Sequence, residues 1–484
     1  MFKDTFKVLI AINAIWLYPL ATNVFATPVV SSVTRTENQL TIVGSSFGVK
    51  PTAAPLRWET WNGASEGSTP YEASSGWWSV SPNTAEQPII TYDKSKVRST
   101  GQAVVDMSQA PNPTSPTNAI SKIFYRNAIG FVKTKKIYLN LWVYTDHSKN
   151  PLNNLIDTQS KFMHISNNIF SSNFSSFPYI QASFWEDVRP NYNQLRTSMY
   201  TNAVISSDAA QLTANNSDLS SRPIVEAEGW HNVEMEINQG TVDTANGSMT
   251  IRIAGPGYNN YGTRSQTGKI MVGTAPTWLS GTSYTVGKAV WYNGTRYTCM
   301  TGLTSTTSPD LDQAHWAKSA NHDYLDAITF WIWAQKRSSN AWSSTRQYYA
   351  GSKADYNGKA YICISDVMSA STPDIDTVHW QKKFDQVWPA STTKWYLDSI
   401  YLDNSFARVE VCDSSTWSAR AHCEMQPAST WSEGTITSTL TSGNFTPGQS
   451  VYLYVVSEDG TVNSSGYKMQ LGPTPPKNLK GTVK

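Results

Sequence analysis

Two stretches of this chain repeat one another without a gap, 64 residues apart. Each copy spans about 43 residues, so about 20 residues of other sequence separate them. The shared positions are Trp278, Tyr284, Gly287, Tyr292, Asn293, Gly294, Tyr297, Cys299, Pro309, Asp310, Asp312, His315 and Trp316 in the first copy, and Trp342, Tyr348, Gly351, Tyr356, Asn357, Gly358, Tyr361, Cys363, Pro373, Asp374, Asp376, His379 and Trp380 in the second. The chain therefore contains two small modules, at 276–319 and 341–383, set into a larger host.

The host is predicted to be all-β. Helical periodicity is nearly absent, and short alternating runs are separated by clusters of Gly, Asn, Ser and Pro. Residues 231–237 and 248–253 alternate on either side of a Gly-rich turn and predict a hairpin, with Val233, Met235 and Ile237 inward. Residues 325–334 and 395–403 predict further strands. We expect an antiparallel β-sandwich of the jelly-roll kind.

Residues 137–144 form the clearest single strand. Ile137, Leu139, Leu141 and Val143 take one face of it, and Tyr138, Asn140, Trp142 and Tyr144 take the other. The aromatic face is either a platform for sugar rings or the contact with a further layer, and the sequence leaves both open.

Residues 1–26 have the pattern of a secretory signal peptide, with an uncleaved membrane anchor as the alternative. Lys3 and Lys7 make a basic start, Val8 to Leu20 are mostly apolar, and Ala26 ends a run suited to cleavage. We therefore expect a secreted or cell-surface protein with no membrane segment after cleavage. The formal net charge of +2 is too small to indicate binding to nucleic acid.

Composition favours carbohydrate as the partner. Charged residues are 15%, against an average of about 25%. The chain also holds 19 Trp and 24 Tyr. Aromatic-rich polar loops are typical of secreted β-proteins that stack rings on sugars, although most such rings fill the core.

Four cysteines in an exported chain suggest up to two disulfides. Cys412 and Cys423 lie in one local segment and are the predicted pair. A disulfide that closes such a short loop stabilises the folded state by about 3 kcal/mol. Cys299 and Cys363 hold the same position in the two modules. They are either buried in their own modules or bridged to one another.

The run Gly229-Trp-His-Asn232, leading into the predicted hairpin, resembles the laminin-G/concanavalin-like jelly roll. The Tyr-Leu-Asp-x-Ile runs at Tyr324 and Tyr396 are similar to late strands of that fold. The resemblance covers roughly 56–413 without the modules, and it implies the fold rather than a chemistry.

The modules resemble the small chitin- and cellulose-binding modules of secreted hydrolases. This resemblance implies two three-stranded β-modules that bind an insoluble β-glycan by aromatic stacking, through Trp291, Tyr292, Trp316, Trp278, Tyr356, Trp380 and Trp342. Members that bind crystalline polymer carry adjacent exposed aromatics where this chain has His315-Trp316 and His379-Trp380. The second copy also has Asp355 in place of Trp291, so the first copy is expected to bind better.

Residues 27–48 resemble the opening strands of an immunoglobulin-like domain shared by plexins and transcription factors, and 407–456 resemble its remaining strands. We expect the jelly roll to be nested in this sandwich; the alternative is an independent C-terminal sandwich. The expected division is 1–26 signal peptide, 27–55 with 405–472 immunoglobulin-like, 56–275 with 320–340 and 384–404 jelly roll, 276–319 and 341–383 modules, and 473–484 tail. Such insertions at loops are physically tolerated.

Catalytic patterns are weak. Glu234 and Glu236 share a strand face at a spacing suited to a glycoside hydrolase, but Arg252 on the partner strand could pair with either. A polysaccharide lyase needs a base and a group that neutralises a uronate. The residues that could supply them are His164, Tyr179, Arg196 and Tyr200, without the family signatures of alginate lyases.

No cofactor is expected. The seven histidines lack zinc-ligand spacing. Asp398, Asp403 and Asn404 are the suggested ligands of a structural calcium.

The sequence therefore predicts a nonenzymatic, exported carbohydrate-binding protein for a chitin-like or other β-glycan. Two alternatives stay open. One is a lyase or glycoside hydrolase with a catalytic jelly roll and targeting modules, and the other is a structural adhesin or filament subunit. Oligomeric state is not predicted.

Overall fold

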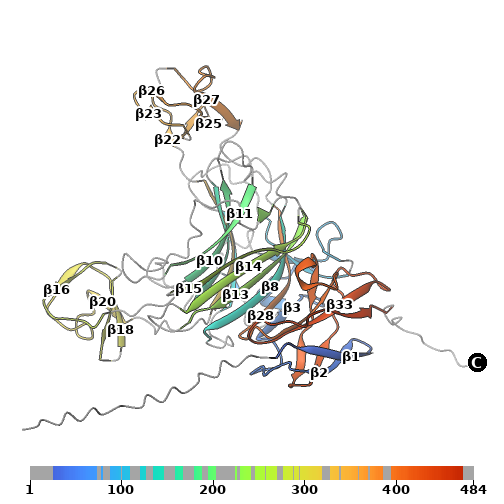
Figure 1. Cartoon of the computed structure of the whole chain (residues 1–484). Coiled ribbons are helices and arrows are strands. Elements are labelled where there is room, and N and C mark those ends of the chain that lie inside the picture. The colour runs from blue at the N-terminus through green and yellow to red at the C-terminus, as the bar shows by residue number, and fades with distance from the viewer. Residues whose placement is uncertain are drawn as a thin grey trace, which may run out of the picture.

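Antiparallel sheets make up nearly all the regular structure of the computed structural model (Figure 1), which confirms the all-β prediction. The structure describes residues 26–472 except 74–77, 80–87, 100, 109–119, 127–133, 146–157, 167–178, 188–193, 203–223, 226–228, 241–245, 257, 270–275, 287, 294, 319–326, 337–339, 351, 358, 369–370 and 385–393. The predicted signal peptide, except residue 26, and the predicted tail lie outside these residues. The described helices are α1 (Pro70–Ala73) and the 3₁₀ turn η4 (Trp417–Ala419). No helix among the described residues is long and apolar enough to cross a membrane.

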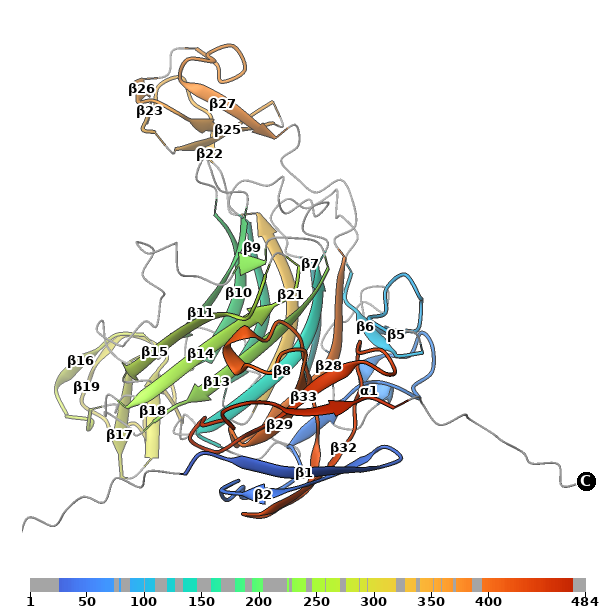
Figure 2. The same cartoon turned by 45° about the vertical axis from the view of Figure 1, so that its right-hand side comes forward.

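Two sheets form a central sandwich (Figure 2). The eight-stranded sheet consists, in order, of β15 (Gly262–Lys269), β14 (Gly247–Ala254), β13 (Gly229–Asn238), β8 (Lys136–Thr145), β28 (Trp395–Asp403), β6 (Val104–Asp106) and β5 (Ile89–Thr91), with β3 (Arg57–Glu59) also paired to β28. The seven-stranded sheet consists of β12 (Ile224–Val225), β11 (Gln194–Asn202), β10 (Tyr179–Asp187), β9 (Thr158–Ser166), β21 (Ala327–Lys336), β7 (Ile120–Arg126) and β4 (Trp78–Ser79).

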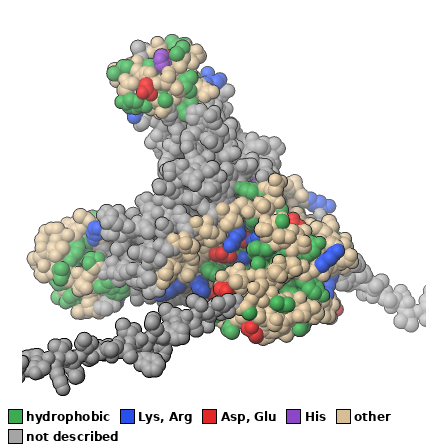
Figure 3. All heavy atoms as spheres, in the orientation of Figure 1, with side chains coloured by type: hydrophobic (Ala, Val, Ile, Leu, Met, Phe, Trp, Pro, Cys, Tyr) green, Lys and Arg blue, Asp and Glu red, His purple; other side chains and the backbone are tan. Residues whose placement is uncertain are grey.

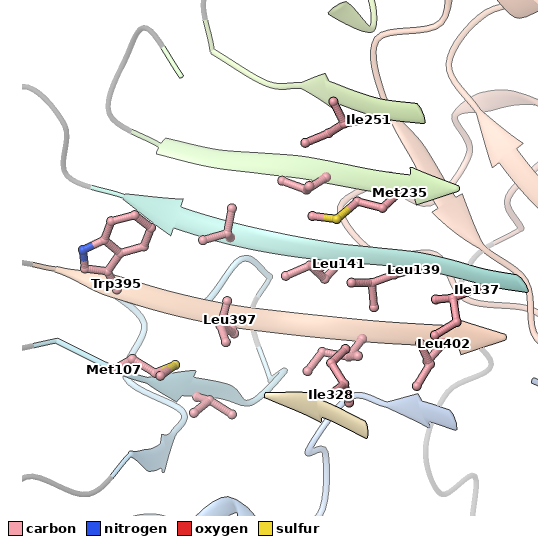
Figure 4. Close-up of a cluster of buried hydrophobic side chains, with 14 of the residues drawn as sticks. Met107, Ile137, Leu139, Leu141, Met235, Ile251, Ile328, Trp395, Leu397 and Leu402 are labelled. Carbon is pink, nitrogen blue, oxygen red and sulfur yellow. The ribbon is translucent and has the colours of Figure 1, made fainter. Parts of the chain in front are cut away.

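The core of the central sandwich lies between these sheets (Figure 4). The alternating face of β8 and the predicted inward residues of the β13–β14 hairpin are fully buried in it, as expected from their period of two. Ile328 of β21 joins the same cluster, so the core touches both sheets.

A second sandwich, here called the terminal sandwich, is built from both ends of the described chain. One sheet joins β1 (Val29–Thr36), β2 (Gln39–Ser45), β32 (Thr435–Thr439) and β31 (Ala428–Trp431). The other joins β30 (Cys423–Met425), β29 (Arg408–Cys412), β33 (Ser450–Val456) and β34 (Tyr467–Gln470). Strands β2 and β32 pair directly, and Figure 2 shows blue β1 and β2 beside red β32. Leu40 and Ile42 share one hydrophobic core with Val409, Val411 and Leu453.

The predicted disulfide is present between β29 and β30 of the terminal sandwich. Cys412 and Cys423 are direct cross-strand neighbours and form the bond. Cys299 and Cys363 are free and fully buried, each in its own module.

The two modules fold alike but not identically. Module one (276–319) has a three-stranded sheet of β17 (Ala289–Tyr292), β18 (Thr295–Cys299) and β20 (Trp316–Lys318), and a separate pair of β16 (Thr282–Tyr284) and β19 (Leu303–Ser305). Module two (341–383) repeats it with β24 (Lys353–Tyr356), β25 (Lys359–Cys363) and β27 (Trp380–Phe384), and with β23 (Gln347–Tyr348) and β26 (Val367–Met368). Its main sheet gains a fourth, parallel strand, β22 (Asn340–Ala341), so a three-stranded sheet describes only module one.

The asparagine of the Asn-Gly turn in each module has the expected backbone conformation. Asn293 has φ 46° and Asn357 has φ 47°, the left-handed conformation that this hairpin turn requires.

Candidate functional site

The modules owe their fold to one buried aromatic pair each. Tyr284 and Trp316 meet edge to face with ring centroids 5.0 Å apart, and Tyr348 and Trp380 do the same at 4.7 Å. Trp316 and Trp380 are each 2% exposed. The prediction that these two rings contact sugar is therefore wrong, because a ring enclosed by its own module has no free face to stack on.

A second aromatic pair packs at the edge of this core in both copies. Trp278 and Tyr292 meet edge to face at 5.4 Å, and Trp342 and Tyr356 repeat that contact at 5.4 Å. All four side chains are half-buried, so each pair keeps some surface on the solvent side. Trp291, the position that differs from Asp355, is half-buried as well.

The most exposed aromatic residue described in either module was not predicted. Tyr349 is 62% exposed, directly after buried Tyr348 in module two, and the first copy has Thr285 at this position. The signal was present in the repeat itself. A tyrosine that replaces a polar residue next to a core position must point the other way along an extended chain.

The four lyase candidates lie in three adjacent strands, β9, β10 and β11. His164 and Tyr200 are both register partners of Gln181, on either side of β10. Tyr179 is two positions before Gln181 on the same strand, and Arg196 is opposite Trp185. All of these positions therefore share one face of the seven-stranded sheet. Their side chains lie outside the described part of the structure.

That face is the one away from the core. Ile328 is buried in the core, and across the sheet it is paired with Ile165, which is paired with Ile180. His164 and Gln181 are each one residue along their strand from Ile165 and Ile180. Successive residues of a strand point to opposite faces, so the positions of His164 and Gln181 are on the face away from the core. The seven-stranded sheet thus brings Tyr, His, Arg and Gln positions together on its outer face.

The outer face of the eight-stranded sheet is instead covered by the terminal sandwich. Tyr138 and Trp142 are 0% and 4% exposed, and the Arg408 guanidinium lies 4.1 Å from the Tyr138 ring. The His422 ring lies 5.0 Å from that of Trp142. The aromatic face of β8 is therefore the contact with a further layer, not a sugar platform.

Glu234 and Glu236 lie in this covered layer, so the prediction of a hydrolase pair is wrong. Arg252 bonds both, as the hairpin register suggested, at 3.3 Å to Glu234 and 2.9 Å to Glu236. Arg420 lies 3.3 Å from Glu234, and Arg408 lies 3.4 Å from Glu236. Burial raises the pKa of Glu236, but the guanidiniums of Arg408 and Arg252 outweigh it and hold that pKa below the ordinary value. A general acid needs the opposite shift and access to substrate.

The suggested calcium ligands are also occupied. Asp403 forms a buried ion pair with Lys50 at 2.6 Å, and Asp398 forms one with Arg98 at 3.0 Å. Both carboxylates already have a cation beside them, so the prediction of a calcium site from Asp398, Asp403 and Asn404 is wrong. The described residues contain one other cluster of candidate metal ligands, Glu410 with Cys412 and Cys423, and those sulfurs are in the disulfide.

No family model matches the chain, and no curated protein matches it. Among solved structures, alginate lyase Aly36B covers 73% of this chain with 97% of its own, at 10% identity and a TM-score of 0.33. A marine PL-14 alginate lyase from Aplysia kurodai matches over 58% of this chain and 98% of its own, at 11% identity and TM-score 0.32. The alginate lyase vAL-1 from Chlorella virus matches over 65% and 90%, at 8% identity and TM-score 0.28. These likenesses are distant, and what those enzymes act on is not transferred to this chain.

Proposed function

We propose that this chain is an exported protein that binds an extracellular polysaccharide through aromatic rings on its two modules. The observation that carries the proposal is that both modules contain one buried and one half-exposed pair of aromatic rings. One Trp–Tyr pair is buried and holds the fold, and a second Trp–Tyr pair stays half-exposed in the same geometry in both copies. Ring surface that stays exposed in the folded module is suited to stacking on sugars. The disulfide in the terminal sandwich favours export.

Each module adds one further ring at a different place, Trp291 in module one and Tyr349 in module two. The two modules would therefore meet the polymer with related but unequal surfaces. Linked weak sites raise apparent affinity through effective concentration when both reach one polymer. Chitin or another β-glycan is the proposed ligand class, and the nested division of the chain given above is the proposed domain organisation.

The repeat supplies variants that test this without disturbing the fold. Trp291→Asp and Tyr349→Thr each place in one module the residue that the other module already tolerates at the equivalent position. We expect wild type to be retained on chitin or cellulose, each single variant to bind several-fold more weakly, and the double variant to lose about tenfold or more. Retention would be measured by pull-down on chitin, cellulose and soluble acidic glycans.

Two outcomes would contradict the proposal. Wild type that is retained on none of these glycans would remove polysaccharide binding altogether and favour a structural adhesin. Equal retention of wild type and the double variant would show that these added rings are not the contact surface. Matching circular dichroism of all variants is the control.

A second candidate function, eliminative cleavage of a uronate polysaccharide, is favoured by the register of the seven-stranded sheet. In such a reaction Arg196 would pair with the uronate carboxylate, and His164 or a tyrosine would take the proton from C5. The C5 electron pair forms the C4–C5 double bond as the bond to the C4 oxygen breaks, and a second tyrosine would protonate the leaving oxygen. Tyr179 and Tyr200 are the tyrosine positions on that face.

This candidate is tested by the ultraviolet absorbance of the new double bond when the full chain is mixed with a uronate polymer. We expect turnover that falls by about 10²-fold or more in Tyr200→Phe, the size typical for a proton-transfer residue. Glu236→Gln, in the covered layer, is the control and leaves turnover unchanged if it folds. Absence of any absorbance change with polymers of mannuronate, guluronate or glucuronate would exclude the candidate.

A further inference from the structure

Each module carries a histidine bonded to an aspartate three residues before it, outside the aromatic core. His315 Nδ1 lies 2.8 Å from Asp312 Oδ1, and His379 Nδ1 lies 2.9 Å from Asp376 Oδ1. The histidine side chains are 40% and 34% exposed. The same pair, with the same ring nitrogen used, has therefore been kept on the surface of both copies.

The aspartate determines what the imidazole can do. Because the carboxylate accepts the proton on Nδ1, the neutral ring keeps its lone pair on Nε2. No hydrogen bond to either Nε2 is found among the residues that the structure describes. The outer nitrogen is thus an oriented acceptor, and its natural donor is a hydroxyl group.

Exposed apolar residues lie next to this histidine along the backbone in both modules. The Met300 amide donates to the His315 carbonyl at 2.7 Å, and the Ile364 amide donates to the His379 carbonyl at 2.8 Å. Met300 and Ile364 are both 44% exposed. Leu311 and Ile375, on the turn four residues before each histidine, are 76% and 71% exposed.

The two copies keep apolar residues at these positions, while three other exposed apolar positions are polar in the opposite copy. Leu279, Tyr349 and Met368 are exposed, and the opposite copy has Ser343, Thr285 and Thr304 at those positions. Figure 3 shows hydrophobic side chains on the visible surface of both modules. Preservation of a histidine and two aliphatic residues without a role in the core points to a shared ligand.

We propose that His315 with Met300 and Leu311, and His379 with Ile364 and Ile375, form a second sugar-contact site in each module, and that it selects neutral sugars. The aliphatic side chains lie against the apolar face of a sugar ring, and Nε2 accepts a hydrogen bond from a hydroxyl. With a neutral imidazole the pair carries the aspartate's negative charge, which disfavours uronates. The inference rests on the proposed binding function and adds its ligand class.

The test uses the full chain and measures binding to chitin, cellulose and a soluble polyuronate. His315→Ala with His379→Ala is expected to weaken binding to the neutral polymer about tenfold, the loss of one hydrogen bond in each module. His315→Gln with His379→Gln is expected to recover most of it, because the amide oxygen is again an acceptor. Gln313→Ala with Thr377→Ala, on exposed positions of the same turns, is the matched control and is expected to bind like wild type.

The possible outcomes distinguish the histidine site from the proposed polysaccharide binding as a whole. If wild type binds no glycan, the proposed function fails. If wild type binds and the double alanine variant binds equally, the function stands and the histidine site is wrong. Equal losses in the alanine and glutamine variants, or stronger wild-type binding to the polyuronate than to the neutral polymers, would overturn the acceptor role.

Discussion

Replacing Arg98 by alanine is expected to lower the free energy of unfolding by about 3–5 kcal/mol. The Arg98 side chain is 1% exposed and bridges the two sandwiches, bonding Asp398 of β28 at 3.0 Å and Glu424 of β30. Burial raises the pKa of Glu424, but the Arg98 guanidinium and the bond to His422 together outweigh it and hold that pKa at about 2. Removal of Arg98 would leave Asp398 buried without its cation and Glu424 with His422 as its remaining ion-pair partner, and that desolvation is the source of the cost.

The chain offers a matched control for this prediction. Lys136 of β8 also reaches the terminal sandwich, through Glu458 at 2.7 Å, but these side chains are 37% and 30% exposed. Lys136→Ala is expected to cost less than about 1 kcal/mol, because water replaces a partner that is already solvated. Urea unfolding followed by tryptophan fluorescence would measure both. Equal costs would show that burial does not set the value of these ion pairs.

Replacing Trp316 by alanine is expected to unfold module one while the sandwiches stay folded. Truncating a buried tryptophan costs about 3–5 kcal/mol, which is as much as a domain of about 40 residues can supply. Hydrogen exchange of peptides from 276–319 would show loss of protection there, with β8 and β28 unchanged.

Trp291→Asp is the control, since Asp355 occupies that position in module two. It is expected to keep the protection of module one. Protection that survives Trp316→Ala would contradict the assignment of Trp316 to the core. Loss of glycan binding by a Trp316 variant would, on the present structure, report unfolding rather than a removed contact.

The alternation of apolar and polar residues along the chain was sufficient to predict the strands. The β13–β14 hairpin, its inward residues and the apolar face of β8 follow from a period of two, because a pleated strand with one buried face imposes that period on its own sequence. The repeat predicted two modules and their Asn turns for the same reason, since a tight turn constrains its own residues. The disulfide was predictable from proximity along the chain.

Site assignments from sequence are wrong where they depend on what packs against a side chain. Trp316 and Trp380 are predicted sugar contacts, yet each is buried by residues of its own module. Glu234 and Glu236 have the spacing of a hydrolase's carboxylate pair. In the folded protein, however, they form ion pairs with Arg420 and Arg408, which are far from them in the sequence. Tyr349 lies at a position where the copies differ, opposite Thr285, so the pattern that the copies share does not point to it.

The all-β class, the strand faces, the repeat and the cysteine pair could thus be predicted, because they depend on residues that are near one another in the chain. Which aromatic rings are buried, and which carboxylates have a cation partner, follows from the folded structure alone. Those properties depend on what packs against a side chain. In this protein the packing partners of β8 and β13 come from a terminal sandwich whose strands lie at both ends of the described chain.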